Sequence, residues 1–182
     1  MTRHEAMELL FEYTEGESLR RHALAVEASM RTYASLLGED EEKWGLVGLL
    51  HDFDYERYPD ATDHPIKGAA ILEERGVSGD IRRAILGHAT YTGVERDTKM
   101  AKVLFACDEL CGFIYACAVV RPNKIADMKA KSVRKKMKDK GFARAVSRDD
   151  IREGAEESGF DLTEHITCVI EAMRGISGEL GL

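Results

Sequence analysis

The sequence has little that would divide, cross-link or anchor a chain. Only three of its 182 residues are proline, and no Ser/Gly-rich linker or internal repeat interrupts it, so we expect one domain over residues 1–182. No apolar run reaches the roughly 18 residues that cross a membrane, and the first residues do not form a secretion signal. We therefore expect a cytoplasmic protein with no membrane partner. The four cysteines lack paired CxxC spacing, which favours reduced core thiols over a disulfide framework or a zinc knot.

Alternating strand patterns are almost absent too, and apolar residues recur with the period of a helix. The pattern predicts an all-α, single-domain helical bundle. Gly38 and Gly76 are expected to end helices, and Asp161 with Glu164 three residues later predicts a helix start. A chain of this length can bury about two-thirds of its surface, so its core needs no disulfide or structural metal. The expected helices cover 2–13, 17–37, 40–52, 65–75, 78–89, 97–118, 123–139, 148–158 and 162–177.

Positive charge is scarce except in one segment. The chain has 26 Lys and Arg against 33 Asp and Glu, a formal net charge of −7. Residues 121–144 hold ten basic and two acidic residues, so this basic segment carries +8 and the rest of the chain −15. Such a segment indicates an anionic partner, although a run of charge is more commonly a solvated helix face.

Ionisable residues fall where the helical pattern reserves positions for the core. His22 continues an apolar stripe from Leu19 to Leu37, so its side chain should point inward. The adjacent pair His51-Asp52 follows a helical stretch that is apolar on nearly every face. Burying such a pair is costly unless something compensates the carboxylate.

Three more residues of these types occupy comparable positions. Asp108 shares one face of its helix with apolar residues, and His88 ends the apolar face of another. His64 begins a helix in which Gly68 would allow another group to approach closely. All three side chains are therefore expected to face the interior.

These six side chains, four imidazoles and two carboxylates, admit two interpretations. Each histidine taken alone is more often a hydrogen-bonded core residue. Taken together, one cluster around a divalent metal compensates all six, whereas separate networks would each have to be satisfied. Imidazole and carboxylate ligands suit Mn, Fe, Co, Ni or Zn. The remaining histidines, His4 and His165, have polar neighbours and are expected at the surface.

The order of these residues resembles the H…HD…D signature of the HD-domain superfamily, whose all-helical members are mostly metal-dependent phosphohydrolases. The resemblance covers residues 18–120, the expected HD metal-binding core, and leaves 121–182 as a C-terminal helical extension that carries the basic segment. It implies two divalent ions, with Asp52 bridging from the first to the second. The implied ligands of the first ion are His22, His51, Asp52 and Asp108.

The string from His64 to Leu72 is similar to the HxxxGAxIL string of the binuclear, HDIG-type branch, and His88 falls where that branch has its next ligand histidine. The branch includes dinucleoside-tetraphosphate hydrolases and cyclic-dinucleotide phosphodiesterases. This chain departs from the phosphodiesterases because Ala89 follows His88 and no Gly-Tyr-Pro motif occurs. It departs from the 5′-deoxynucleotidases because no Arg-Trp pair precedes His22.

The implied activity is hydrolysis of a phosphoester or phosphoanhydride in a nucleotide or another small phosphorylated metabolite. Phosphoryl transfer needs positive charge and accurate positioning. Arg121, Lys124 and Lys67 are candidate phosphate contacts, although a solvated surface position would explain all three. Asp52 and Asp54 are the candidate catalytic carboxylates. Asp54 would orient the attacking water or accept its proton, or else cap the loop that follows it.

Two other functions are open for the same pattern. A centre of four histidines and two aspartates also resembles the di-iron oxygenases of this superfamily. A non-catalytic nucleotide-binding module would use the basic segment instead. Single-stranded nucleic acids bind to aromatic side chains that stack on their bases, and residues 121–144 contain only Phe142, so we expect no strong nucleic-acid affinity.

Overall fold

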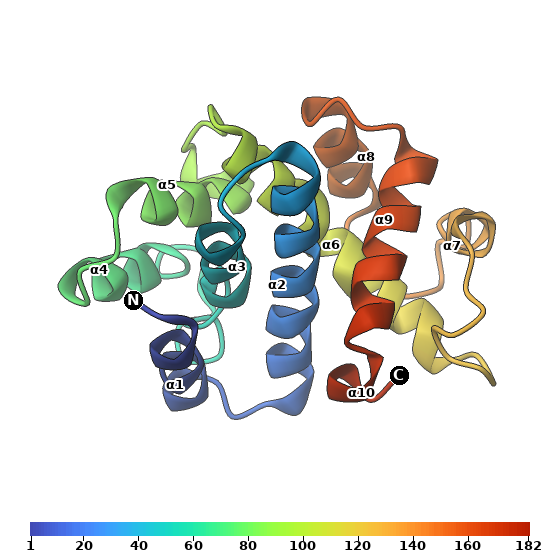
Figure 1. Cartoon of the computed structure of the whole chain (residues 1–182), viewed down its shortest axis with the longest axis horizontal. Coiled ribbons are helices and arrows are strands. Elements are labelled where there is room, and N and C mark those ends of the chain that lie inside the picture. Colours follow the sequence, from blue (N-terminus) through green and yellow to red (C-terminus); the bar gives the residue numbers. More distant parts are fainter.

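The computed structural model describes residues 1–182 and confirms the all-α fold. The long helix α2 stands between α1, α3, α4 and α5 on one side and α7 and α9 on the other, and α6 crosses behind it (Figure 1). None of the helices combines the length and the apolar composition that crossing a membrane requires. The helices are α1 (Arg3–Tyr13), α2 (Glu17–Leu37), α3 (Glu41–Leu50), α4 (Ile66–Glu74), α5 (Gly79–His88), the 3-10 turn η1 (Thr90–Thr92), α6 (Lys99–Val119), α7 (Ala130–Lys136), α8 (Arg148–Glu157), α9 (Leu162–Gly175) and α10 (Ser177–Leu180).

Two helices form the centre of the core. Helix α2 packs against α3, α6 and α9, and α6 packs against α5 and α8. Together with their neighbours they bury one cluster of 41 apolar residues, in which Met30 of α2 and Leu104 of α6 are fully buried. Because α2 and α6 face each other, polar residues within their apolar stripes are also brought together inside the bundle.

The expected helix ends are confirmed at three positions. The Asp161 side chain accepts hydrogen bonds from the backbone N–H groups of Thr163 and Glu164 at the start of α9. Gly38 after α2 and Gly76 after α4 have φ of 69° and 73°. A glycine adopts this left-handed conformation without the steric cost that a Cβ brings.

The predicted helix at 123–139 is wrong over its first half. Lys124 has φ of 46°, outside the right-handed helical region, and the helix begins only with α7. The Arg174 guanidinium from α9 donates to the carbonyls of Ile125 and Met128. The side chains of these two residues are buried beneath the turn. A contact from a distant helix thus replaces the local hydrogen bonds that the prediction assumed. The separate turns η1 and α10 were not predicted either.

His165 is buried, and its predicted surface position is wrong. The Tyr33 hydroxyl from α2 donates to Nδ1 at 2.6 Å, and Nε2 donates to the Ala106 carbonyl on α6 at 2.9 Å. The polar neighbours of His165 in sequence lie on the other face of α9, so their polarity does not indicate exposure of His165 itself. Burial lowers the pKa of His165 to about 4. His4 is exposed, as expected.

The buried His165 should make stability depend on pH. In the unfolded chain a histidine binds a proton near pH 6.5, whereas in the folded protein His165 does so only near pH 4. The stabilising contribution of neutral His165 is therefore complete above about pH 6.5 and is lost as the pH falls toward 4. Over this range the free energy of unfolding should decrease by up to about 3 kcal/mol. Urea denaturation over this pH range measures it, with His165→Gln as the control that lacks the titrating group. Equal pH slopes in both proteins would contradict the assignment.

Gly48 allows α3 to lie close against α2. A Cβ at this position would be 2.8 Å from the Val26 carbonyl oxygen and 2.9 Å from the Glu27 Cα. Both neighbours are backbone atoms, so neither can move without displacing α2. The close approach also sets the distance between His22 on α2 and His51 at the end of α3.

Replacing Gly48 should therefore separate α2 from α3. We expect Gly48→Ala to lower the free energy of unfolding by about 1–3 kcal/mol, the usual cost of overpacking a core. Gly175→Ala is the matched control, because nothing lies within 4 Å of a Cβ built there. Chemical denaturation measures both variants. If Gly48→Ala were as stable as Gly175→Ala, the backbone contact would not constrain the helices.

Candidate metal centre

Six inward-facing side chains come together from five parts of the chain. His22 is on α2, His51 and Asp52 follow α3, and Asp108 is in the middle of α6. His64 lies just before α4, and His88 is the last residue of α5. They form two groups whose possible ligand atoms lie within 4.8 Å of one another. The groups are His22, His51, Asp52 and Asp108, and Asp52, His64 and His88.

The first group has the spacing of ligands around one ion. His22 Nε2 lies 3.0 Å from Asp108 Oδ1 and 3.2 Å from His51 Nε2. His51 Nε2 lies 3.4 Å from Asp108 Oδ1 and 3.5 Å from Asp52 Oδ2. Ligand bonds of about 2.1 Å in octahedral or tetrahedral geometry place neighbouring ligand atoms about 3.0–3.4 Å apart. The two imidazole nitrogens and the two carboxylates therefore fit a transition-metal ion.

The Asp52 carboxylate belongs to both groups. Its Oδ2 is the atom nearest the first group, 3.5 Å from His51 Nε2. Its Oδ1 lies 3.2 Å from His64 Nε2 and 3.2 Å from His88 Nε2. Oδ2 also lies 3.9 Å from His22 Nε2, so each oxygen faces a different pair of imidazoles.

Three of the four imidazoles are oriented through their other ring nitrogen. His51 Nδ1 lies 2.8 Å from the Gly48 carbonyl, and His88 Nδ1 lies 2.5 Å from the Ile85 carbonyl. A carbonyl can only accept, so Nδ1 carries a proton in both rings, and Nε2 is the ring nitrogen that faces the centre and would bind an ion. Hydrogen bonds of this kind commonly orient histidines that bind metals.

Asp54 orients the third imidazole, and neither expectation for it is met. Its side chain is buried, with Oδ1 2.8 Å from His64 Nδ1 and Oδ2 accepting the Gly68 N–H at 2.9 Å. It therefore neither faces the space where a substrate would bind nor caps the loop with its side chain. A Cβ on Gly68 would lie 2.6 Å from the Asp54 Cγ, so the glycine makes room for this carboxylate.

The HD family model matches residues 19–112, just over half of the chain. The chain belongs to the HD-domain family. HD domains are mostly metal-dependent phosphohydrolases and bind divalent metal ions. The match spans all six residues of the two groups, so the family and the geometry agree on the type of site. Comparison with curated proteins and with solved structures found no match.

The six clustered side chains, called the HD centre below, stabilise one another's charged forms. Burial opposes ionisation of Asp52 and Asp108, but the surrounding imidazoles outweigh burial and hold the pKa of both carboxyls well below the usual range. Burial likewise opposes protonation of His64, but hydrogen bonds to Asp52 and Asp54 raise its pKa to about 9. The carboxylates are therefore ionised at neutral pH, as metal binding requires, while His64 must lose a proton.

A cavity of about 440 Å³ borders the HD centre. Five of the six clustered residues line it, whereas His51 is fully buried behind them. No lysine or arginine lines the cavity. The other lining residues are Tyr55, Ala89, Thr90, Tyr91, Phe105, Glu109, Gly112, Ala145, Val146 and Asp150.

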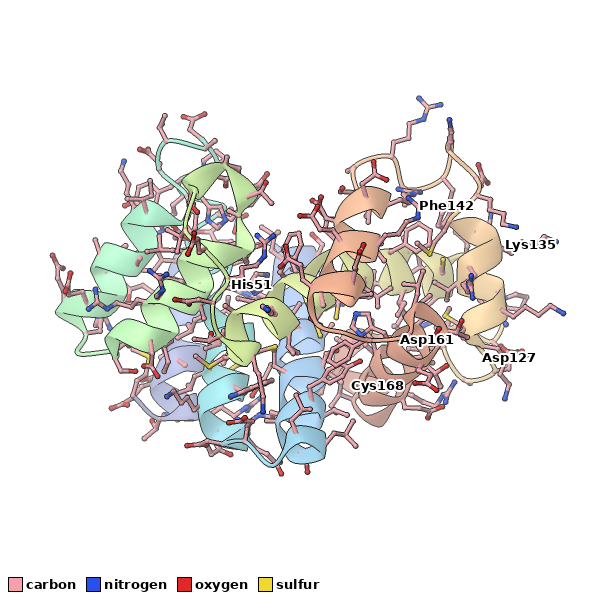
Figure 2. The ribbon with its side chains drawn as sticks, turned by 90° about the horizontal axis from the view of Figure 1, so that it is seen from above. His51, Asp127, Lys135, Phe142, Asp161 and Cys168 are labelled. Carbon is pink, nitrogen blue, oxygen red and sulfur yellow. The ribbon has the colours of Figure 1, made fainter.

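Arg121 and Lys124 do not reach this cavity, so the structure does not support their expected contact with phosphate. The second half of α6 separates Arg121 from Asp108, a rise of about 20 Å. Arg121 pairs with Asp127, and Lys124 Nζ donates to the Gly181 carbonyl. Figure 2 shows a similar separation for Lys135, which lies at the outer edge, whereas His51 is in the other half of the molecule.

Lys67 does not line the cavity either. Its ammonium pairs with Asp63 at 2.7 Å and lies 4.6 Å from the centre of the Tyr58 ring. The solvated surface position that the sequence also allowed is therefore the one observed.

Because Asp54 orients His64, replacing it should weaken metal binding at the group of Asp52, His64 and His88 only. An asparagine can accept only one of the two hydrogen bonds that Asp54 accepts, from His64 and from Gly68. If its amide group faced His64, Nδ1 would become the acceptor and the proton would move to Nε2. We expect Asp54→Asn to weaken binding of the second ion about 10–100-fold and to spare the first.

Titration with Mn²⁺ and elemental analysis measure this effect. Asp63→Asn is the matched control, because Asp63 is nearby but pairs only with Lys67. Two ions bound with unchanged affinity in Asp54→Asn would show that Asp54 does not orient His64.

Proposed function

We propose that this HD protein is a metal-dependent phosphohydrolase. Its substrate would be a phosphoester or phosphoanhydride of a nucleotide or another small phosphorylated metabolite. The observation that carries the proposal is the Asp52 carboxylate, which two histidine groups share beside a cavity in a chain of the HD family. Two ions of Mn, Fe, Co, Ni or Zn suit this mixture of imidazole and carboxylate ligands.

The proposed ligands follow the two groups. His22, His51, Asp52 and Asp108 would hold the first ion, and Asp52, His64 and His88 the second. When bound, such ions lower the pKa of water toward neutrality and withdraw electrons from phosphoryl oxygens.

The protein's own contribution would be orientation. Hydrogen bonds at Nδ1 fix three imidazoles before any ligand binds, so little rearrangement is needed on binding. The exposed rings of Tyr55 and Tyr91 line the cavity and offer surfaces for the organic part of a substrate. Asp52 would act as the shared ligand, and Asp54 as a positioning residue for His64.

A substrate panel tests the proposal directly. The protein is stripped with a chelator, reloaded with each of the five metals, and assayed for phosphate release from mononucleotides, dinucleoside polyphosphates, cyclic nucleotides and sugar phosphates. The expected result is release that persists without oxygen in the manganese form. Activity that requires both iron and O₂ would instead support a di-iron oxygenase, and no release from any compound would contradict the phosphohydrolase.

Loss of one ligand should remove metal and activity together. We expect His51→Ala to lower phosphate release by at least about 100-fold, because loss of a group that merely orients a ligand already costs about 10–100-fold. Its unfolding free energy should fall as well, since the partly buried carboxylates of Asp52 and Asp108 lose a partner. His4→Ala removes an exposed histidine and is the control. Stoichiometric metal in purified His51→Ala, measured by elemental analysis, would refute the ligand assignment.

A further inference from the structure

The cavity beside the HD centre has a wall with two carboxylates that are not members of the clustered groups. Glu109 follows Asp108 on α6, and Asp150 is in the first turn of α8. Ser147 orients both segments. Its backbone N–H donates to Glu109 Oε2 at 3.0 Å, and its hydroxyl accepts the Asp150 backbone N–H at 3.1 Å.

Neither carboxylate is paired with a basic side chain. No ion pair involves Glu109 or Asp150, and no lysine or arginine lines the cavity. Arg148, which follows Ser147, donates to three backbone carbonyls of residues 142–146 and lies over the Phe113 ring. Arg152 pairs with Asp149 outside the cavity. Negative charge on this wall is therefore left to act on whatever enters.

Other residues of the cavity lining are aromatic or apolar. Tyr55 and Tyr91 are 41% and 55% exposed, and Phe105 and Val146 add apolar surface. Aromatic and apolar groups can pack against an uncharged organic group, whereas they offer nothing to a chain of phosphates. The only positive charge available to a phosphoryl group would come from ions at the HD centre.

We propose that Glu109 and Asp150 restrict this centre to substrates with one phosphoryl group on an organic part that bears no further negative charge. This inference rests on the proposed phosphohydrolase function and narrows its substrate class. The single phosphoryl group is directed to the ions, and the organic part lies toward the tyrosines. A second or third phosphate would extend toward two carboxylates and be repelled by them.

Binding of inorganic anions tests the wall independently of turnover. Phosphate, pyrophosphate and tripolyphosphate are titrated calorimetrically into the manganese-loaded protein at low ionic strength and pH 8.5. Retained manganese is checked after each titration. The variants are Glu109→Gln and Asp150→Asn, each of which removes one negative charge from the wall.

We expect each variant to bind tripolyphosphate about tenfold more tightly, with a smaller gain for phosphate. This size corresponds to unit charges roughly 12 Å apart at an effective dielectric constant of about 20. Asp149→Asn is the matched control, because it removes the same charge from an exposed neighbour that does not line the cavity. If the wall variants gained no more than Asp149→Asn, the proposal would be overturned.

Turnover supplies the second arm of the experiment. Release of phosphate from p-nitrophenyl phosphate reports the chemistry. No release from this ester or from any compound of the substrate panel would refute the phosphohydrolase, while the binding result still decides the role of the wall. With activity present, we expect kcat/KM to fall from AMP to ADP to ATP in the wild type, and to fall less steeply in Glu109→Gln and Asp150→Asn. Equal efficiency on AMP and ATP in the wild type would overturn the restriction to one phosphoryl group.

Discussion

The sharing of one carboxylate by two groups of imidazoles is the interaction on which the rest of the site depends. Asp52 directs one oxygen toward His51 and the other toward His64 and His88. A buried carboxylate is unfavourable unless opposite charge surrounds it. The fold satisfies this condition by ending α3, starting α4 and ending α5 around a single residue, with α2 and α6 closing the remaining side.

Such convergence requires helices to approach more closely than ordinary side chains allow. Gly48 brings α3 against the backbone of α2, and Gly68 admits the Asp54 carboxylate behind His64. A third glycine, Gly154 on α8, has no room for a Cβ because the Ala106 Cα of α6 would lie 2.6 Å away. Helix α8 contributes a wall of the cavity, so the same close packing that builds the core also limits what the site can admit.

The sequence predicted most of the helices and the inward direction of the clustered histidines and aspartates, because a 3.6-residue period directly reports which face of a helix is buried. It could not predict contacts made between distant segments. The turn at Ile125 depends on Arg174, and the burial of His165 depends on Tyr33. The prediction also placed Arg121 too near the metal centre. Arg121 follows the end of α6, whereas Asp108 lies in the middle of this helix, so the two residues are far apart along its axis.

We propose that Asp52 bridges two metal ions, and diffraction tests this proposal most directly. Crystals of the manganese-loaded protein, with data collected near the manganese absorption edge, locate each ion by its anomalous signal. We expect two peaks, one among His22, His51 and Asp108 and one beside His64 and His88, with an Asp52 oxygen bound to each ion. A single ion, or two ions with Asp52 bound to only one, would contradict it.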